Sequence, residues 1–329
     1  MFKYRGTAVG IDLGTANLLM YIKGKGITVR EPSIITIDVN KKEIVATGQK
    51  AKDMIGRTHS GLQTIRPIRD GVIADYESTT LMIQHYLKQA VSKGIFATKP
   101  TLVISVPSNI TSVEKRAVID AAIQGGARDA HIVEESFAAA IGASLPVWEP
   151  TGSMIVDIGG GTTEVAVISL GGIVISTSCK VAGDEMDRLI IQHIRKEYQL
   201  LIGEPTAEKI KINLFNEELS NRKSIRGRDL VTGLPRTIEI TDEEIWNVLI
   251  EPIEIINQTI RHTLENTPPE LAADIMERGL ILTGGVAQLR GLDTVISNAT
   301  NLPVIVSDDP LDCVVKGTAK VLENVKILK

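Results

Sequence analysis

Aromatic residues and cysteines are scarce in this chain of 329 residues. Aromatic side chains make up 3% of it, the net charge is −4, and there are only two cysteines, Cys179 and Cys313. An acidic chain with few aromatic side chains lacks the basic, stacking surface that nucleic-acid-binding proteins use, so we expect no nucleic acid as a partner. The cysteines lack the spacing of a metal or redox site, which predicts buried, reduced thiols.

Long hydrophobic runs are missing as well. No apolar stretch approaches the roughly 20 residues that a membrane-spanning helix needs, and the N-terminus lacks the pattern of a secretory signal. Hydrophobic residues nevertheless make up 43% of the chain and charged residues 23%, as in ordinary globular proteins. The length suffices for two domains with separate cores. We therefore expect a cytoplasmic protein of two domains.

What the sequence does contain is one turn motif used twice. The strings GIDLGT at 10–15 and VDIGGGTT at 156–163 each stand between two apolar runs. Each is typical of a β-hairpin with a tight turn of glycine and threonine, and an aspartate, Asp12 or Asp157, lies near the end of the incoming strand. The repetition in two halves of the chain predicts two related half-molecules that hold a nucleotide between them.

The residue types in these turns suit phosphate binding. The glycines are expected to adopt positive φ and to bring backbone N–H groups close to an anion; they are Gly14, Gly159, Gly160 and Gly161. Threonine hydroxyls, on Thr15, Thr162 and Thr163, add donors without bulk. Asp12 and Asp157 would repel phosphate unless a cation lay between, and Mg²⁺ fits because it is usually held by few carboxylates, phosphate oxygens and water. Two unrelated glycine turns would not explain the matching aspartates and threonines.

A third glycine turn follows an apolar strand predicted at 279–283. Gly284 and Gly285 come next, and the segment 286–300 has helical character. A strand, a glycine turn and a helix N-terminus form a natural seat for a ribose or phosphate. Such turns are common, so this one gains weight only because it is the third of three.

Strand-like and helix-like segments alternate through most of the chain. Further strands are predicted at 102–106, 131–133, 172–179 and 237–240, and helices at 79–92, 112–124, 134–144, 184–200, 241–265 and from 269 onward. Pro252 is expected to kink or split the long helix. The basic stretch at 222–228 is expected to be a solvated loop. The pattern is α/β, with a mixed sheet in each half.

These strings resemble those of the actin/Hsp70/sugar-kinase ATPase superfamily and, within it, the MreB family of bacterial actin homologues. The resemblance covers residues 9–328 and rests also on DGVIAD at 70–75, AGDEMD at 182–187, PPELAAD at 268–274 and LTGG at 282–285. It implies an actin-like ATPase fold, with two similar halves, mixed sheets around a nucleotide cleft, and four subdomains. Subdomain IA would take residues 1–31, 70–144 and 315–329; IB 32–69; IIA 145–180 and 241–314; and IIB 181–240.

The resemblance also implies which residues bind the nucleotide. Phosphates would be bound by Thr15, Ala16 and Asn17 in the first turn and by residues 159–162 in the second, with Mg²⁺ held through water by the two aspartates. Ribose and base contacts would fall on Glu208, Lys211, Gly284 and Gly285. Glu208 and Lys211 lie three residues apart, so they share a helix face. Without the resemblance they would be an ordinary surface pair.

Glu135 is the catalytic residue that the resemblance implies. In the family the second glutamate of a Glu-Glu-Pro string orients the attacking water, and here the string is Glu134-Glu135-Ser136. A carboxylate there can orient water for in-line attack, while metal and backbone dipoles lower most of the barrier. The alternative is that both glutamates only favour a helix N-terminus, and we keep that alternative for Glu134.

Two positions depart from the family pattern. Val286 stands where the family has a glycine after the Thr-Gly-Gly turn. A β-branched residue would strain the turn if positive φ were required there; if the position only starts a helix, Val286 is tolerated and crowds the purine. Ser136 in place of proline is the milder change, because serine tolerates the first turn of a helix.

Family members bind the inner face of the membrane through an N-terminal amphipathic segment or a small hydrophobic loop. In this chain Ile95 and Phe96 stand between Lys93 and Lys99. The two apolar side chains would insert into the membrane while the lysines contact anionic lipid, an attraction of about 1 kcal/mol per basic residue. Alternatively, both side chains pack into the core. One weak anchor gives marginal binding, so many copies in a polymer would be needed.

The implied function is that of a cytoskeletal ATPase that hydrolyses ATP to ADP and phosphate. It would form filaments on the cytoplasmic face of the membrane and organise cell-wall synthesis to set cell shape. Its partners would be other copies of itself, the anionic membrane surface and membrane-embedded cell-wall synthesis proteins. Because fold does not fix function, two alternatives stay open: an assembly scaffold with weak or no turnover, suggested by Val286, and a small-molecule kinase, for which no base or sugar pocket is evident. A chaperone ATPase would need a further substrate-binding domain.

Overall fold

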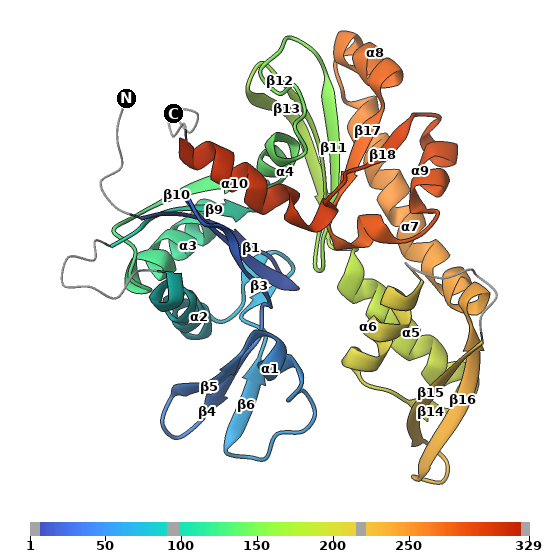
Figure 1. The fold of residues 1–329 in the computed structure, drawn as a ribbon. Coiled ribbons are helices and arrows are strands. Elements are labelled where there is room, and N and C mark those ends of the chain that lie inside the picture. Colours follow the sequence, from blue (N-terminus) through green and yellow to red (C-terminus); the bar gives the residue numbers. More distant parts are fainter. Residues whose placement is uncertain (1–6, 91–98, 215–221, 324–329) are drawn as a thin grey trace.

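A computed structural model describes residues 7–90, 99–214 and 222–323, and it shows two lobes side by side (Figure 1). We call the half built around the first glycine turn the first lobe (residues 7–142) and the half built around the second the second lobe (residues 153–312). The two lobes are joined near the 142–153 connection and by the C-terminal helix α10 (Cys313–Glu323). Within the described residues, none of the helices is both long and apolar enough to cross a membrane.

Each lobe contains a five-stranded mixed sheet, and the two sheets have the same strand arrangement. The first has the order β10-β9-β1-β2-β3, and the second β18-β17-β11-β12-β13. The bounds are β1 Ala8–Leu13, β2 Asn17–Ile22, β3 Gly26–Pro32, β9 Thr101–Val106, β10 Asp129–Glu134, β11 Ser153–Ile158, β12 Thr163–Ser169, β13 Gly172–Cys179, β17 Leu280–Thr283 and β18 Val304–Val306. In both sheets an antiparallel three-stranded meander is extended by two parallel strands. The mixed sheet predicted for each half is thereby confirmed.

The helices and sheets alternate in layers. In the first lobe α2 (Tyr76–Ala90) and α3 (Ser112–Gln124) cover the outer face of the sheet. In the second lobe α7 (Asp242–Glu265), α5 (Gly183–Tyr198), α8 (Pro269–Arg278) and α9 (Leu292–Thr300) share one core with the outer face of the other sheet. Between the sheets lie α4 (Glu135–Gly142) and α10, whose buried residues contact strands of both. The central pair of helices therefore holds the two lobes together.

Helices α4 and α10 pack closely because small residues face each other. A Cβ atom at Gly142 would overlap the Cys313 carbonyl, and one at Gly317 would overlap the carbonyl of Ala138. Backbones that approach this closely leave little room for relative sliding. The two lobes are thus joined stiffly along α4 and α10, and the cleft opens on the side of the molecule away from these two helices.

Each lobe also carries a smaller outlying part, seen at the bottom of Figure 1. In the first lobe β4 (Ile35–Asp38), β5 (Glu43–Thr47), β6 (Leu62–Ile65) and the short α1 (Gly48–Lys52) form a three-stranded unit, followed by the short pair β7 (Ile68–Arg69) and β8 (Val72–Ile73). In the second, β14 (Leu200–Leu201), β15 (Arg222–Asp229) and β16 (Pro235–Thr241) lie beside α5 and α6 (Glu204–Asn213).

Three local predictions were wrong. The basic stretch 222–228 is not a loop: it forms most of β15, paired residue by residue with β16. Helix α7 is not split at the buried Pro252, because a buried apolar face, with Leu249, Ile253 and Ile256, outweighs the hydrogen bond that proline removes; the alternative of a kink there stays a prediction. The predicted helix at 286–300 is split into a 3₁₀ turn (Gly285–Gln288) and α9, since Gly291 adopts φ +80° between them.

Candidate functional site

A cleft of about 550 Å³ lies between the lobes, and nearly every residue predicted to bind the nucleotide or metal or to act in catalysis lines it. Thr163 is the exception: it is buried, it does not line the cleft, and its hydroxyl donates to the Val181 carbonyl (2.7 Å), so the prediction of a phosphate donor there was wrong. The first lobe contributes Asp12, Gly14, Thr15, Ala16, Asn17 and Glu135. The second lobe contributes Asp157, Gly159, Gly160, Gly161, Thr162, Glu208, Lys211, Gly284, Gly285 and Val286. Residues that are far apart in the sequence thus meet in one place.

The two glycine turns face each other across the base of the cleft. A Cβ atom on Gly160 would lie 2.5 Å from the Cβ of Ala16, and one on Gly161 would lie 2.6 Å from the Thr15 hydroxyl. The positive φ predicted for these glycines was wrong, because neither Gly14 nor residues 159–161 adopt it. Gly160 and Gly161 must be small because the turns approach each other closely there, whereas the nearest neighbours of Gly14 and Gly159 are carbonyl oxygens of their own turns.

The two aspartates occupy equivalent places in the two sheets. Asp12 on β1 accepts a hydrogen bond from the Ser105 hydroxyl of β9 (3.0 Å), and Asp157 on β11 accepts one from the Thr283 hydroxyl of β17 (2.8 Å). Burial raises the pKa of Asp157 to about 6. Burial, and then the charge of Asp157, raise the pKa of Asp12 to about 7. A nearby cation would lower both pKa values again.

This arrangement suits a hydrated Mg²⁺ that also contacts phosphate. The carboxylates are buried and repel each other, so each gains from a positive charge between them. Nowhere in the described residues do three or more His, Cys, Asp or Glu gather in a way suited to a metal ion. A cation here would therefore take its remaining ligands from water and phosphate, as Mg²⁺ commonly does.

Glu135 lies at the first residue of α4 and is 7% exposed. Burial is the main cause of a pKa well above the usual value, and the neighbouring charges of Glu164, Asp12 and Asp157 raise it further. Glu134, by contrast, is the residue before the helix and makes no capping hydrogen bond through its side chain. Only the second glutamate of the pair lines the cleft.

Glu164 and its partners were not predicted from the sequence. Glu164 on β12 is 2% exposed and accepts hydrogen bonds from the backbone N–H and the hydroxyl of Ser108, both at 2.9 Å. The Ser108 hydroxyl also lies 2.9 Å from that of Ser136, the residue that replaces the family proline. Burial raises the pKa of Glu164 to about 7. Its place opposite Asp157 in the hairpin register was a signal that could have singled it out.

Glu208 and Lys211 both lie on α6 but have different partners. Lys211 is 7% exposed; its ammonium donates to the Gly183 carbonyl (2.6 Å) and pairs with Asp187 (2.9 Å). Glu208 pairs instead with Lys52 of the first lobe, at 2.5 Å. They are not the ordinary surface pair that their spacing alone would indicate. Asp187 also lines the cleft, and its Oδ1 is a buried acceptor that no described residue satisfies.

In the third glycine turn, Gly284 adopts a positive φ that requires glycine. Its φ is +84°, and a Cβ there would overlap the backbone of Ile158. Val286 does not have positive φ; it lies in the 3₁₀ turn, is 3% exposed and packs in the core of the second lobe. The expected strain at Val286 is therefore absent, and its side chain forms part of the cleft wall.

The two residues predicted to contact the membrane, Ile95 and Phe96, lie outside the described residues. The predicted helix before them is α2, which runs to Ala90. Insertion into lipid and packing into the core both remain predictions for this pair.

Known proteins resemble the chain over nearly its whole length. A family model described as MreB/Mbl protein matches residues 6–329. The cell shape-determining protein Mbl of Bacillus subtilis is 48% identical over 319 residues, with 96% of each chain covered. The cell shape-determining protein MreB of Escherichia coli is 46% identical over 333 residues, with 98% of this chain and 96% of the relative covered.

Solved structures agree with the sequence relatives. MreB5 of Spiroplasma citri bound to AMPPNP has a TM-score of 0.92 and 38% identity, with 98% of both chains covered. The chain of the MamK double helical filament has a TM-score of 0.82 at 22% identity, with 97% of this chain and 99% of that one covered, a likeness of fold alone. The chain therefore belongs to the MreB/Mbl family and has the actin-like fold.

Proposed function

We propose that this protein is an ATP-hydrolysing cytoskeletal protein that forms filaments on the inner face of the cell membrane and organises cell-wall synthesis. One observation carries the proposal: two equivalent glycine turns, two equivalent aspartates and Glu135 meet in a single cleft between equivalent lobes. The MreB5 structures with AMPPNP and with ADP support a nucleotide as the ligand.

Different residues of the cleft would contact different parts of the nucleotide. Thr15, Ala16 and Asn17 in one turn and residues 159–162 in the other would bind the phosphates through backbone N–H groups and hydroxyls. Asp12 and Asp157 would hold Mg²⁺ through water, and the ion would offset the negative charge of the phosphates. At the other end of the cleft, Glu208, Lys211 and the turn at Gly284 and Gly285 would contact ribose and base.

Glu135 would orient the water that attacks the terminal phosphate. Glu135 is buried at the first residue of α4, and the hydroxyl of the next residue, Ser136, lies 2.9 Å from that of Ser108. Because the nucleophile needs orientation more than activation in phosphoryl transfer, this position suffices for the role. The proton of the water leaves with the phosphate product.

Assembly and location follow the relatives. Cell shape-determining proteins and a filament structure stand among the similar proteins, which supports self-association as the first partner interaction. The anionic membrane surface, contacted through Ile95 and Phe96, and membrane-embedded cell-wall synthesis proteins are the further partners we propose. The residue limits of the four subdomains, which the family resemblance implies, remain a prediction. The backbone strain that would have favoured the scaffold alternative is absent at Val286. Its side chain still lines the cleft, and phosphate release decides between the scaffold and the ATPase.

The proposal is tested by co-sedimentation of the purified protein with vesicles that contain anionic lipid. Samples carry Mg·ATP, Mg·AMPPNP, Mg·ADP or no nucleotide, and phosphate release is followed in parallel. We expect pelleting that requires anionic lipid and responds to the nucleotide, together with steady phosphate release. Filaments without any phosphate release would favour the scaffold, and transfer of phosphate to a small molecule would favour a kinase.

A further inference from the structure

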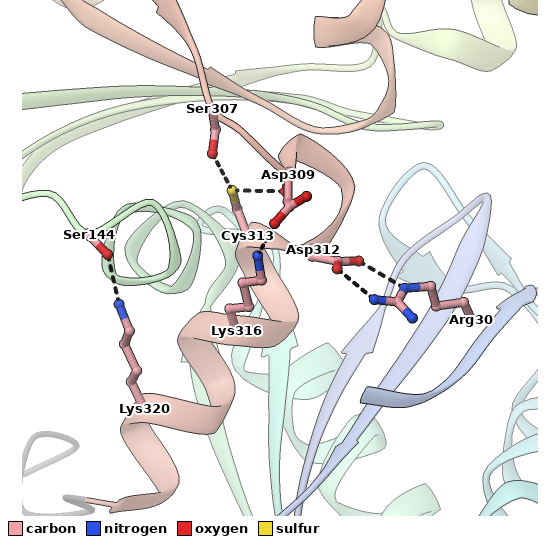
Figure 2. Close-up of polar contacts among 8 residues, drawn as sticks. All are labelled: Arg30, Ser144, Ser307, Asp309, Asp312, Cys313, Lys316 and Lys320. Carbon is pink, nitrogen blue, oxygen red and sulfur yellow. Dashed lines mark hydrogen bonds and ion pairs between the residues drawn. The ribbon is translucent and has the colours of Figure 1, made fainter. Parts of the chain in front are cut away.

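Three ion pairs join the two lobes along the edge of the cleft. Arg30 on β3 binds both carboxylate oxygens of Asp312, at 2.7 and 3.1 Å (Figure 2). Lys52 at the end of α1 pairs with Glu208, at 2.5 Å, and Arg66 after β6 pairs with Glu204, at 3.2 Å. We call these three pairs the rim pairs.

The rim pairs share one polarity. Their basic residues all belong to the first lobe, and their acidic residues all belong to the second. Five of the six residues line the cleft; Asp312 is the exception, although its neighbours Pro310 and Leu311 do. A fourth pair, Lys180 with Asp70, has the opposite polarity, but it is longer, at 3.7 Å, and neither residue lines the cleft.

Helix α6 receives two of the three pairs on one face. Glu204 and Glu208 lie one turn apart, so both point towards the outlying part of the first lobe. The same helix is fixed to the second lobe by the buried Lys211, which binds Gly183 and Asp187. These two rim pairs therefore connect α6 with the outlying part of the first lobe. Separating the lobes at this edge must break them.

We propose that the rim pairs act as a clasp that controls exchange of the nucleotide. The stiff contact of α4 and α10 leaves the edge at Lys52–Glu208 and Arg66–Glu204 as the side where the lobes can part. The Arg30–Asp312 pair lies closer to that contact, because Asp312 directly precedes α10. When the lobes part, Lys52 and Arg66 lose their carboxylates first and present positive charge to an entering polyphosphate. When they close, the pairs slow the departure of the ligand. This inference rests on the proposed nucleotide site and adds its regulation.

The Arg66–Glu204 pair gives the sharpest test, because we place neither residue in the nucleotide or catalytic machinery. The variants are Arg66→Glu, Glu204→Arg and the double exchange. Partly exposed pairs contribute about 0.2–1 kcal/mol, so each single variant should release a fluorescent ADP analogue about 1.4 to five times faster in stopped flow. The double exchange should restore slow release only in part, because a basic side chain at the first residue of α6 would oppose the helix dipole.

A matched control is Arg222→Glu, which breaks an exposed pair with Glu239 inside one sheet of the second lobe. Its release rate should equal that of the wild type. Raised salt should speed release from the wild type more than from Arg66→Glu, since the screened interaction is already gone in the variant. If the single variants release the analogue at the wild-type rate, the clasp does not exist.

Hydrogen exchange of the nucleotide-free protein separates the clasp from the proposed function. Backbone amides at 15–17 and 159–162 line the cleft, and we expect them to exchange faster in Arg66→Glu and Glu204→Arg than in the wild type and Arg222→Glu. If the wild type binds no nucleotide, the proposed function fails, and this measurement still decides whether the clasp holds the lobes. Unchanged exchange at these amides would overturn the clasp.

Discussion

The two lobes are built alike and equipped differently. Both have a three-stranded meander with two added parallel strands. In both, an aspartate near the end of the central strand accepts a hydrogen bond from a hydroxyl of the neighbouring parallel strand. In the first lobe the outermost parallel strand, β10, leads directly into Glu135. In the second lobe the corresponding strand, β18, leads into the connection to α10, and the turn after β17 forms part of the nucleoside end.

A duplicated scaffold can thus carry an asymmetric site. In the function that we propose, equivalent hairpins would hold the phosphates from both sides, which needs symmetry. Hydrolysis would need one oriented water, and we assign that task to Glu135 of the first lobe. Variants that change one lobe at a time, or one of two neighbouring residues, tell symmetric and asymmetric roles apart.

The largest effect is expected from Glu135→Ala in the first lobe. Loss of the carboxylate that orients the water should reduce phosphate release at least about a hundredfold, while binding of Mg·ATP persists because the glycine turns are untouched. Single-turnover phosphate release and nucleotide titration measure the two quantities. The control is Glu134→Ala, which should turn over at nearly the wild-type rate. Equal losses in both variants would show that the helix start matters and the Glu135 carboxylate does not.

The next effect concerns the equivalent aspartates, measured in metal-free buffer. Burial raises the pKa of Asp157 from an ordinary 3.8 to about 6, so its contribution to stability is full below about pH 4 and is lost as the pH rises through 6. At pH 8, Asp157→Asn should therefore unfold at higher denaturant, with a gain of about 3 kcal/mol in the free energy of unfolding.

Asp12→Asn should change in the same direction, because the pKa of Asp12 is raised to about 7. Both variants should lose the stabilisation that Mg·ATP gives the wild type. Chemical denaturation between pH 4 and pH 8, with and without Mg·ATP, decides the matter. Lower stability of both variants across this range would contradict the account of the paired carboxylates.

The smallest effect is expected where the turns touch. In Gly160→Ala the added Cβ would lie 2.5 Å from Ala16 of the other lobe. The hairpins must therefore move apart, which should lower the free energy of unfolding by about 1–3 kcal/mol. Gly159→Ala is the matched control, because its nearest neighbour is a carbonyl oxygen at 3.4 Å. Thermal unfolding and nucleotide affinity should both separate the variants, and equal behaviour would mean that the turns do not depend on close approach.

The sequence was enough to predict the duplicated hairpins, because each is a local pattern of apolar runs, glycine and aspartate. It was also enough for α3, which matches the predicted limits of 112–124, although its capping residue is Thr111 with Glu114 in a capping box. The strand β15 escaped prediction because its exposed positions carry charged residues, which mimic a loop, and only Ile225 and Asp229 are buried.

Contacts between distant segments could not be predicted from local patterns. Lys52 and Glu208, or Ser108 and Glu164, meet only once the lobes are placed side by side, and nothing in their sequence neighbourhoods indicates a partner. The positive φ predicted for the glycine turns was wrong for a related reason. Gly160 and Gly161 are required by neighbours from the other lobe, and the sequence offered positive φ as the local explanation.

The most direct test of the proposed site is a crystal structure of the wild-type protein with Mg²⁺ and a non-hydrolysable ATP analogue. We expect the phosphates between the turns at 14–17 and 159–162, a hydrated ion between Asp12 and Asp157, and Glu135 facing the terminal phosphate. A nucleotide bound to one lobe alone, or phosphates held away from either turn, would contradict the claim that the duplicated hairpins form one site.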